Sequence, residues 1–150
     1  MKRIVIAGAT GNIGSKTVEH LLTKEVQIHA IVRSQTDKNK KEKLANAGVT
    51  LHELDMQNLT AVTNACAGAH CVLSTLSGLQ DVIIDAQKVL LDGAVAAGVP
   101  RFIPSDFSID FRNLVFGKNR NLDLRKRFYE YVNRQPIKAT SIFNGALMDL

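Results

Sequence analysis

The sequence predicts an α/β fold in which a parallel sheet of about six strands is covered by helices on both faces. Short apolar segments alternate along the chain with longer segments that have helical periodicity. Strands that are apolar throughout are typical of a parallel sheet buried between two helical layers. Crossovers between parallel strands are right-handed, so this alternation predicts a doubly wound sheet with strand order 3-2-1-4-5-6.

Each predicted element follows from a local pattern. Strands are expected where apolar runs are bounded by polar or turn-forming residues, at 3–8, 27–33, 49–54, 70–75, 101–105 and 137–143. Helices are expected between them, at about 12–24, 39–47, 58–66, 80–97 and 122–134. Gly48 and Gly98 follow two of these helices, and glycine readily adopts the left-handed conformation that ends a helix.

Length and composition place the chain among ordinary globular domains. It has 150 residues, of which 45% are hydrophobic and 22% charged, enough for a core of its own. The apolar segment at residues 89–99 is short and contains Asp92, so no membrane span is expected. An apolar strand begins at Ile4 without a leader before it, so we expect no signal peptide and a cytoplasmic location.

The spacing of cysteine and histidine does not predict a metal site. Cys66 and Cys71 are the only cysteines, and they lack the paired C-x-x-C arrangement of zinc sites. We expect both to be reduced and packed as small hydrophobic residues. The histidines fall in different predicted elements, and none lies four residues from another on a helix. No metal is therefore expected.

The net charge of +5 raises the question of nucleic-acid binding. The basic residues gather at 38–43 and between Arg112 and Lys138, without interleaved aromatic residues or a known DNA-binding motif. They are interpreted as solvated helix faces, or as a field that attracts an anionic ligand. Nucleic acid is not an expected partner; the alternative of a basic nucleic-acid-binding module predicts salt-sensitive binding that survives loss of the glycines discussed next.

Three glycines spaced three residues apart lie where the first strand meets the first helix. The start of a helix presents unpaired N–H groups and the positive end of its dipole, which together attract anions. Glycine allows a tight turn and a close approach of the backbone to a phosphate, so the motif predicts a pyrophosphate site. The expected contacts come from Gly8, Thr10, Gly11, Asn12, Ile13 and Gly14. The alternative is a tight turn that binds no ligand.

The residue at the end of the second strand predicts which dinucleotide would bind. A carboxylate at this place holds the ribose 2′-hydroxyl of NAD, but here the residue is Arg33. A guanidinium suits a 2′-phosphate, and a charge-assisted hydrogen bond contributes about 1.5–3 kcal/mol, so the expected cofactor is NADP(H). Ser34 and one of Lys38, Lys40 or Lys41 are expected to add contacts, with Lys41 assigned to the site. For any single lysine of this run, the alternative is a solvated charge.

Asp55 is a further candidate at this edge of the sheet. It lies just past the third strand, where its side chain is placed to border the adenine. An acidic residue ahead of a helix is also typical of an N-cap. Both interpretations stay open at this point.

The segment RFIPSDFSID at residues 101–110 is the most distinctive part of the chain. Together with GATGNIG (8–14), IVRS (31–34) and VLST (72–75), it resembles the NmrA-like and isoflavone reductase-like branch of the atypical short-chain dehydrogenases. The resemblance spans nearly the whole chain. Members of that branch carry RF-x-PSEFG-x-D, so Asp106 stands where they have Glu and Ser108 where they have Gly.

The resemblance implies a Rossmann-type NADP(H)-binding domain and a set of site residues. It places Ser74 and Thr75 along the ribose and nicotinamide, with Phe107 at the border of the cofactor pocket. Reductases of that branch use a lysine near the start of the following helix. Alignment of residues 122–131 reaches Leu124, Arg125 or Lys126, and only Lys126 supplies a titratable amine. Lys126 is therefore the implied proton donor, and the alternative is a surface lysine on a basic helix.

The function that the resemblance implies is NADPH-dependent reduction of a small carbonyl or conjugated aromatic substrate. The alternative is a non-catalytic NmrA-like redox sensor that binds a regulatory protein. In that family the fold continues for about as many residues again, so we expect the substrate-domain portion to be absent from residues 1–150. No helix is predicted after the last strand, and an exposed apolar end favours a homo-oligomer.

Overall fold

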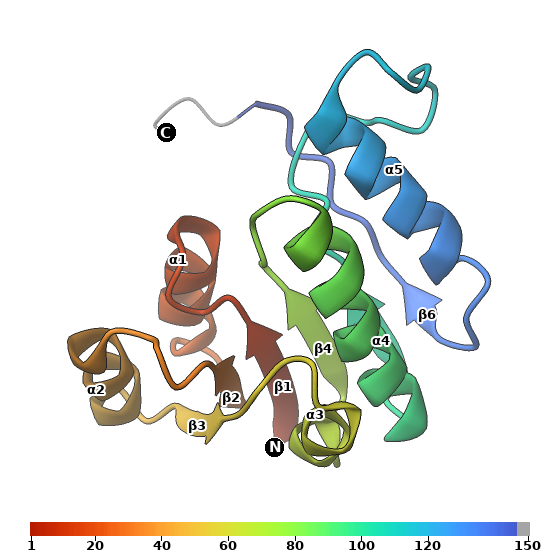
Figure 1. Cartoon of the computed structure of the whole chain (residues 1–150). Coiled ribbons are helices and arrows are strands. Elements are labelled where there is room, and N and C mark those ends of the chain that lie inside the picture. The colour runs from red at the N-terminus through yellow and green to blue at the C-terminus, as the bar shows by residue number, and fades with distance from the viewer. Residues whose placement is uncertain (147–150) are drawn as a thin grey trace.

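A six-stranded parallel sheet runs through the computed structural model, which describes residues 1–146 (Figure 1). The strands are β1 (Lys2–Ala7), β2 (Val26–Val32), β3 (Thr50–Glu53), β4 (Cys71–Ser74), β5 (Arg101–Ile103) and β6 (Lys138–Ala139). Their order is β3-β2-β1-β4-β5-β6, and every neighbouring pair is parallel. The predicted fold class and strand order are therefore confirmed.

The helices connect successive strands. They are α1 (Asn12–Leu21), α2 (Lys38–Asn46), α3 (Leu59–Cys66), the π-helix η1 (Gln80–Ala86), α4 (Gln87–Ala96) and α5 (Arg120–Val132). Each predicted helix exists, but the one expected at 80–97 begins as a π-helix and continues as an α-helix. Apolar spacing along a sequence does not separate these two hydrogen-bond patterns, so this division was not predicted.

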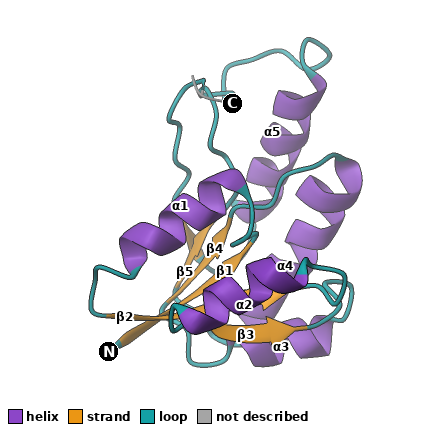
Figure 2. Cartoon of the chain, turned by 90° about the vertical axis from the view of Figure 1, so that its left-hand side faces the viewer, coloured by secondary structure: helices purple, strands orange, loops and turns teal. Residues whose placement is uncertain are grey.

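Helices cover the sheet on both faces (Figure 2). Successive residues of β1 show why: Val5 packs in the core beneath α3, α4 and α5, and Ile6 packs in the core beneath α1 and α2. Both side chains are fully buried. Because side chains alternate across a strand, a strand buried on both faces has to be apolar at consecutive positions. This explains the continuous apolar runs of the sequence.

The last two strands are shorter than predicted. Thr140 donates its N–H to the Phe102 carbonyl at 3.0 Å, after which the chain leaves β5. Beyond Thr140 the chain contacts the loop after β5, where the Ser141 hydroxyl donates to the Asp106 carboxylate at 2.8 Å. The Gly145 N–H also donates to the Ser108 carbonyl, at 3.0 Å. Contacts to this loop thus replace the ladder that the apolar pattern predicted.

No helix within residues 1–146 is long and apolar enough to span a membrane. The cytoplasmic location stays a prediction.

Candidate functional site

The glycine-rich corner lies between β1 and α1, at the carboxyl edge of the sheet. Gly8 has a φ of +88°, in the left-handed region that favours glycine. Gly11 donates its N–H to the Gly8 carbonyl at 3.0 Å and is the N-cap residue of α1. No side chain of the described residues caps this helix. Asn12 and Ile13 open its first turn, so the amides of this turn are available to an anion.

The three glycines are required for different reasons. A Cβ on Gly14 would overlap the Gly8 carbonyl oxygen, and a Cβ on Gly8 would lie 2.7 Å from the Thr75 oxygens. The packing of the corner therefore excludes side chains at both positions. A Cβ on Gly11 would meet only the Gly8 carbonyl oxygen, at 3.4 Å. The protein's own packing does not require glycine at position 11, whereas a ligand close to the backbone would.

Ser74 and Thr75 lie directly beneath this corner, at the end of β4. The Thr75 hydroxyl and N–H both donate to the Ala7 carbonyl, each at 2.9 Å, which ties β4 to the end of β1. Ser74 is fully buried, and its hydroxyl has no hydrogen-bond partner among residues 1–146. Phe107 packs against the core beneath α1 and α2. Their roles along the ribose and nicotinamide stay predictions.

Arg33 follows β2 and lines a cleft of about 650 Å³ with Ser34, Gln35, Glu53, Leu54 and Asp55. Its backbone is held by Thr36, whose hydroxyl accepts from the Arg33 N–H at 3.2 Å and whose N–H donates to the Arg33 carbonyl at 3.0 Å. The exposed guanidinium has no hydrogen bond or ion pair within the described part of the chain. Arg33 is therefore free to bind an anion in the cleft.

Lys41 is held by the protein beside the same cleft. Its ammonium lies 3.0 Å from the Glu53 carboxylate and donates to the Ser34 carbonyl at 3.3 Å. Asp55 accepts from the Gln57 N–H at 2.9 Å, whereas the N-cap of α3 is Asn58. The N-cap alternative for Asp55 is wrong, because a turn separates β3 from the helix.

Lys126 lies on α5, and its contacts are with the loop that precedes this helix. Its ammonium donates to the Leu114 carbonyl at 2.6 Å and lies 4.7 Å from the centre of the Phe116 ring. Within residues 1–146, no hydrogen bond joins Lys126 to Ser74 or to the glycine corner. Its role as a proton donor stays a prediction.

A buried polar cluster around Asp106 was not predicted as part of the site. Asp106 is 1% exposed, and Ser141 donates to one carboxylate oxygen at 2.8 Å, while the other oxygen has no partner among the described residues. Burial raises the pKa of Asp106 to about 6, against the opposing effects of Ser141 and the Arg125 guanidinium. Burial also lowers the pKa of Arg125. The sequence signal for this cluster is a carboxylate, Asp106, within the largely apolar segment FIPSDF (102–107).

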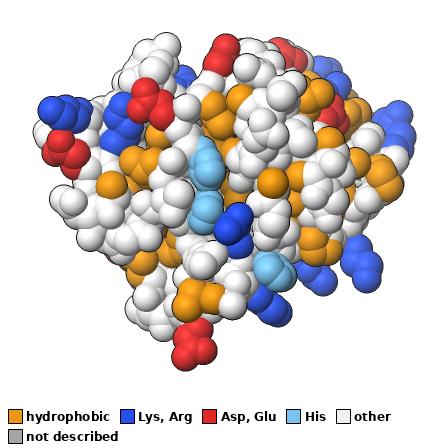
Figure 3. Space-filling model, turned by 90° about the horizontal axis from the view of Figure 1, so that it is seen from below, with side chains coloured by type: hydrophobic (Ala, Val, Ile, Leu, Met, Phe, Trp, Pro, Cys, Tyr) orange, Lys and Arg blue, Asp and Glu red, His pale blue; other side chains and the backbone are white. Residues whose placement is uncertain are grey.

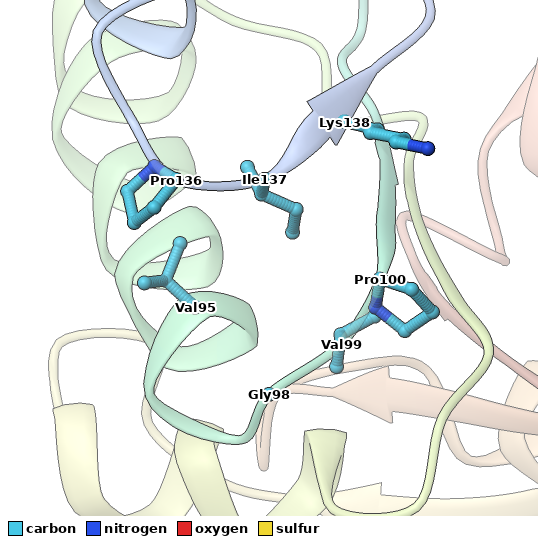
Figure 4. Close-up of a pocket in the computed structure, with 7 residues that line it drawn as sticks. All are labelled: Val95, Gly98, Val99, Pro100, Pro136, Ile137 and Lys138. Carbon is cyan, nitrogen blue, oxygen red and sulfur yellow. The ribbon is translucent and has the colours of Figure 1, made fainter.

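A second cavity of about 490 Å³ lies at the opposite edge of the sheet, near the amino ends of β5 and β6 (Figure 4). Its lining consists of Val95, Gly98, Val99, Pro100, Pro136, Ile137 and Lys138. Ligands of open α/β sheets bind at the carboxyl ends of the strands, so this cavity is the weaker candidate.

The two cysteines are buried, and neither forms a disulfide. Burial raises the pKa of the Cys66 thiol to about 12, so this residue is packed as an unreactive hydrophobic group. Among the described residues, no cluster of three or more His, Cys, Asp or Glu side chains could hold a metal ion.

The strand order and the glycine corner at the point where that order reverses define a Rossmann-fold protein. Residues 1–149 match the model of the NmrA-like family, and the chain belongs to this family.

Several curated relatives are named as oxidoreductases or as homologs of isoflavone reductase. "Oxidoreductase aprR" of Aspergillus flavus is 33% identical over 117 residues, which cover 74% of this chain and 35% of the relative. "Isoflavone reductase homolog A622" of Nicotiana tabacum is 33% identical over 113 residues, covering 72% of this chain and 36% of the relative. The matched segment thus spans about a third of the length of these proteins.

Solved structures of reductases in complex with NADPH have a fold similar to that of this chain. The leucoanthocyanidin reductase of Vitis vinifera, in a binary complex with NADPH, superposes with a TM-score of 0.81 at 25% identity, covering 94% of this chain and 49% of that one. The NADPH-dependent quinone oxidoreductase QOR2 of Escherichia coli, complexed with NADPH, has a TM-score of 0.78 at 26% identity, covering 93% and 48%.

Proposed function

We propose that the chain is the NADP(H)-binding part of an NADPH-dependent reductase that acts on small carbonyl or conjugated aromatic substrates. The observation that carries this proposal is the unpaired Arg33 guanidinium, which lines a cleft at the same sheet edge as the glycine corner. The family match and the NADPH complexes of two similar reductases support it.

In this proposal the backbone holds the pyrophosphate and Arg33 holds the 2′-phosphate. The first-turn amides of α1 and the absence of a side chain at Gly11 suit a bound diphosphate. The cofactor would supply the hydride, and the protein would orient the cofactor and exclude competing reactions. Lys126 would donate the proton after its ammonium leaves the Leu114 carbonyl. A non-catalytic sensor would use the same cofactor site without a role for Lys126.

Titration of the purified protein with NADPH and with NADH tests this function directly. We expect NADPH to bind at least about tenfold more tightly, since one charge-assisted hydrogen bond contributes about 1.5–3 kcal/mol. NADPH at 100 times its Kd should stabilise the fold by about 2.7 kcal/mol in a thermal-shift measurement.

Arg33→Asp should remove the preference for NADPH, because a carboxylate repels the 2′-phosphate and accepts a 2′-hydroxyl. Lys24→Asp reverses the same charge at an exposed position after α1 and should leave the preference intact. Equal affinity of the parent protein for both cofactors would refute the assignment of Arg33.

A further inference from the structure

We propose that the Lys41–Glu53 ion pair sets the selectivity of the cleft for a phosphorylated adenosine ribose, and that Lys41 acts by neutralising Glu53. The inference rests on the proposed NADP(H) function. In this inference the Glu53 carboxylate could accept a hydrogen bond from a ribose 2′-hydroxyl, but its ion pair with Lys41 prevents this.

The charges that line the cleft do not favour a phosphate by themselves. Arg33 provides one positive charge, whereas Glu53 and Asp55 provide two negative ones. Glu53 is the last residue of β3 and pairs in register with Val32, the residue before Arg33. Its carboxylate and the Arg33 guanidinium therefore belong to the same sheet edge. A dianionic 2′-phosphate at this place needs a further cation to balance Glu53.

Lys41 is placed to supply that balance from outside the cleft. It lies in the first turns of α2, and its side chain is 19% exposed, compared with 51% for Glu53. Its ammonium is held at 3.0 Å from Glu53 and also donates to the Ser34 carbonyl. Lys41 is not among the residues that line the cleft. With its ammonium held by these two groups, Lys41 acts in this proposal as a positioning residue, whose effect on the phosphate passes through Glu53.

Removal of Lys41 should change the chemistry that the cleft prefers. In NAD sites the ribose 2′-hydroxyl is held by a carboxylate at the end of β2. Glu53 ends the neighbouring strand β3, beside that place. Without Lys41, Glu53 would repel a 2′-phosphate and accept a hydroxyl. The preference should then shift from the phosphorylated toward the unphosphorylated ribose.

A double-mutant cycle separates this role from direct phosphate binding. Calorimetry would measure binding of 2′,5′-ADP and 5′-AMP to the parent protein, Lys41→Met, Glu53→Gln and the double variant. Lys41→Met should weaken 2′,5′-ADP by about tenfold or more, the scale of one charge interaction near a protein surface, without weakening 5′-AMP. The double variant should recover the affinity of the parent for 2′,5′-ADP to within about threefold.

Failure of the inference and failure of the proposed function give different results. If the double variant binds 2′,5′-ADP as weakly as Lys41→Met, Lys41 contacts the phosphate itself and the inference is wrong. If the parent protein binds neither 2′,5′-ADP nor NADPH, the proposed function is wrong.

Two further variants serve as controls for charge and for folding. Lys38→Met removes the same charge from α2, where Lys38 is 86% exposed and lies 3.8 Å from Glu42, and it should leave both affinities unchanged. Glu53→Gln keeps the partly buried Lys41 side chain in place, so it tests the inference if Lys41→Met fails to fold. We expect Glu53→Gln to strengthen 2′,5′-ADP binding, and weaker binding would overturn the proposal.

Discussion

At the scale of single residues, the glycine corner separates the demands of the fold from those of a ligand. Gly14 leaves no space for a Cβ, because the Gly8 carbonyl oxygen occupies it. Gly11 has space, and its φ of −79° is open to any residue. In the proposed function, a side chain at position 11 would instead lie at the first turn of α1, where the diphosphate would bind.

We therefore predict that alanine at position 11 affects mainly NADPH binding, whereas alanine at position 14 affects the stability of the fold. Gly11→Ala should change the free energy of unfolding by less than about 1 kcal/mol, the scale of an N-cap change, and weaken NADPH by about tenfold or more. Gly14→Ala should lower the free energy of unfolding by about 1–3 kcal/mol, because the corner has to open. Urea unfolding and NADPH titration measure the two quantities. Unchanged NADPH affinity in Gly11→Ala would show that no phosphate approaches this backbone.

Individual residues also show where prediction from sequence ends. The place of Arg33 after β2 followed from the length of an apolar run, and the structure puts it in a cleft. The partner of Lys41 could not be predicted, because Glu53 is 12 residues away and meets it only when α2 packs beside β3. Asp106 was noted only as a departure from a family motif, and its burial depends on α5 and on residues after β6.

At the scale of elements, apolar periodicity predicted the existence and order of every strand but not all of their ends. The central strands β1, β2 and β4 are buried on both faces and lie close to the predicted bounds. The edge strand β6 is shorter, because it pairs with β5 alone and then meets the loop after β5. Ends that depend on such tertiary contacts leave no local signal.

Pairing of β2 with β3 also creates a histidine pair that the sequence did not predict. The Nδ1 atom of His29 lies 2.8 Å from the Nε2 atom of His52, and the rings stack with centres 5.1 Å apart. Adjoining histidines are visible on the face seen from below (Figure 3). Burial lowers the pKa of both residues, Arg3 lowers both further, and His52 adds to the effect on His29.

The pair should make the sheet less stable in mild acid. Below a pH of about 6.5 the unfolded chain binds more protons than the folded one, so the free energy of unfolding falls as the pH falls. His52→Gln removes one titrating ring and should reduce this loss, as measured by urea unfolding between about pH 5 and 7.5. His20→Gln, on an exposed part of α1, serves as the control. Equal pH dependence in parent and His52→Gln would refute the role of the pair.

At the scale of the whole molecule, Asp106 joins three parts of the fold that are distant in sequence. It lies in the loop after β5, accepts a hydrogen bond from Ser141 beyond β6, and interacts electrostatically with Arg125 on α5. The loop follows β5, α5 precedes β6 and Ser141 follows it, so all three parts lie in the half of the domain that contains β4, β5 and β6. The protonation state of one carboxyl group therefore affects how this half of the domain is held together.

Asp106 should oppose the histidine pair in its effect on stability. Its pKa is about 6 in the folded protein, compared with 3.8 for a free aspartate, so the folded state binds more protons between these values. The free energy of unfolding should therefore fall as the pH rises from about 4 to about 6, by an amount on the order of 3 kcal/mol, and stay lower above that range.

Asp106→Asn tests this prediction, because an amide resembles the protonated carboxyl group and can still accept from Ser141. The variant should match the parent near pH 4 and be more stable at about pH 8, since the parent then carries a buried charge that Arg125 does not fully offset. Asp110→Asn is the control of opposite sign: hydrogen bonds from Arg112 lower the pKa of Asp110 to about 2, so its removal should not stabilise the protein at pH 8. If Asp106→Asn were less stable than the parent at pH 8 by urea unfolding, the Arg125 interaction would outweigh the cost of burial, and Asp106 would be a buried ion-pair partner of α5.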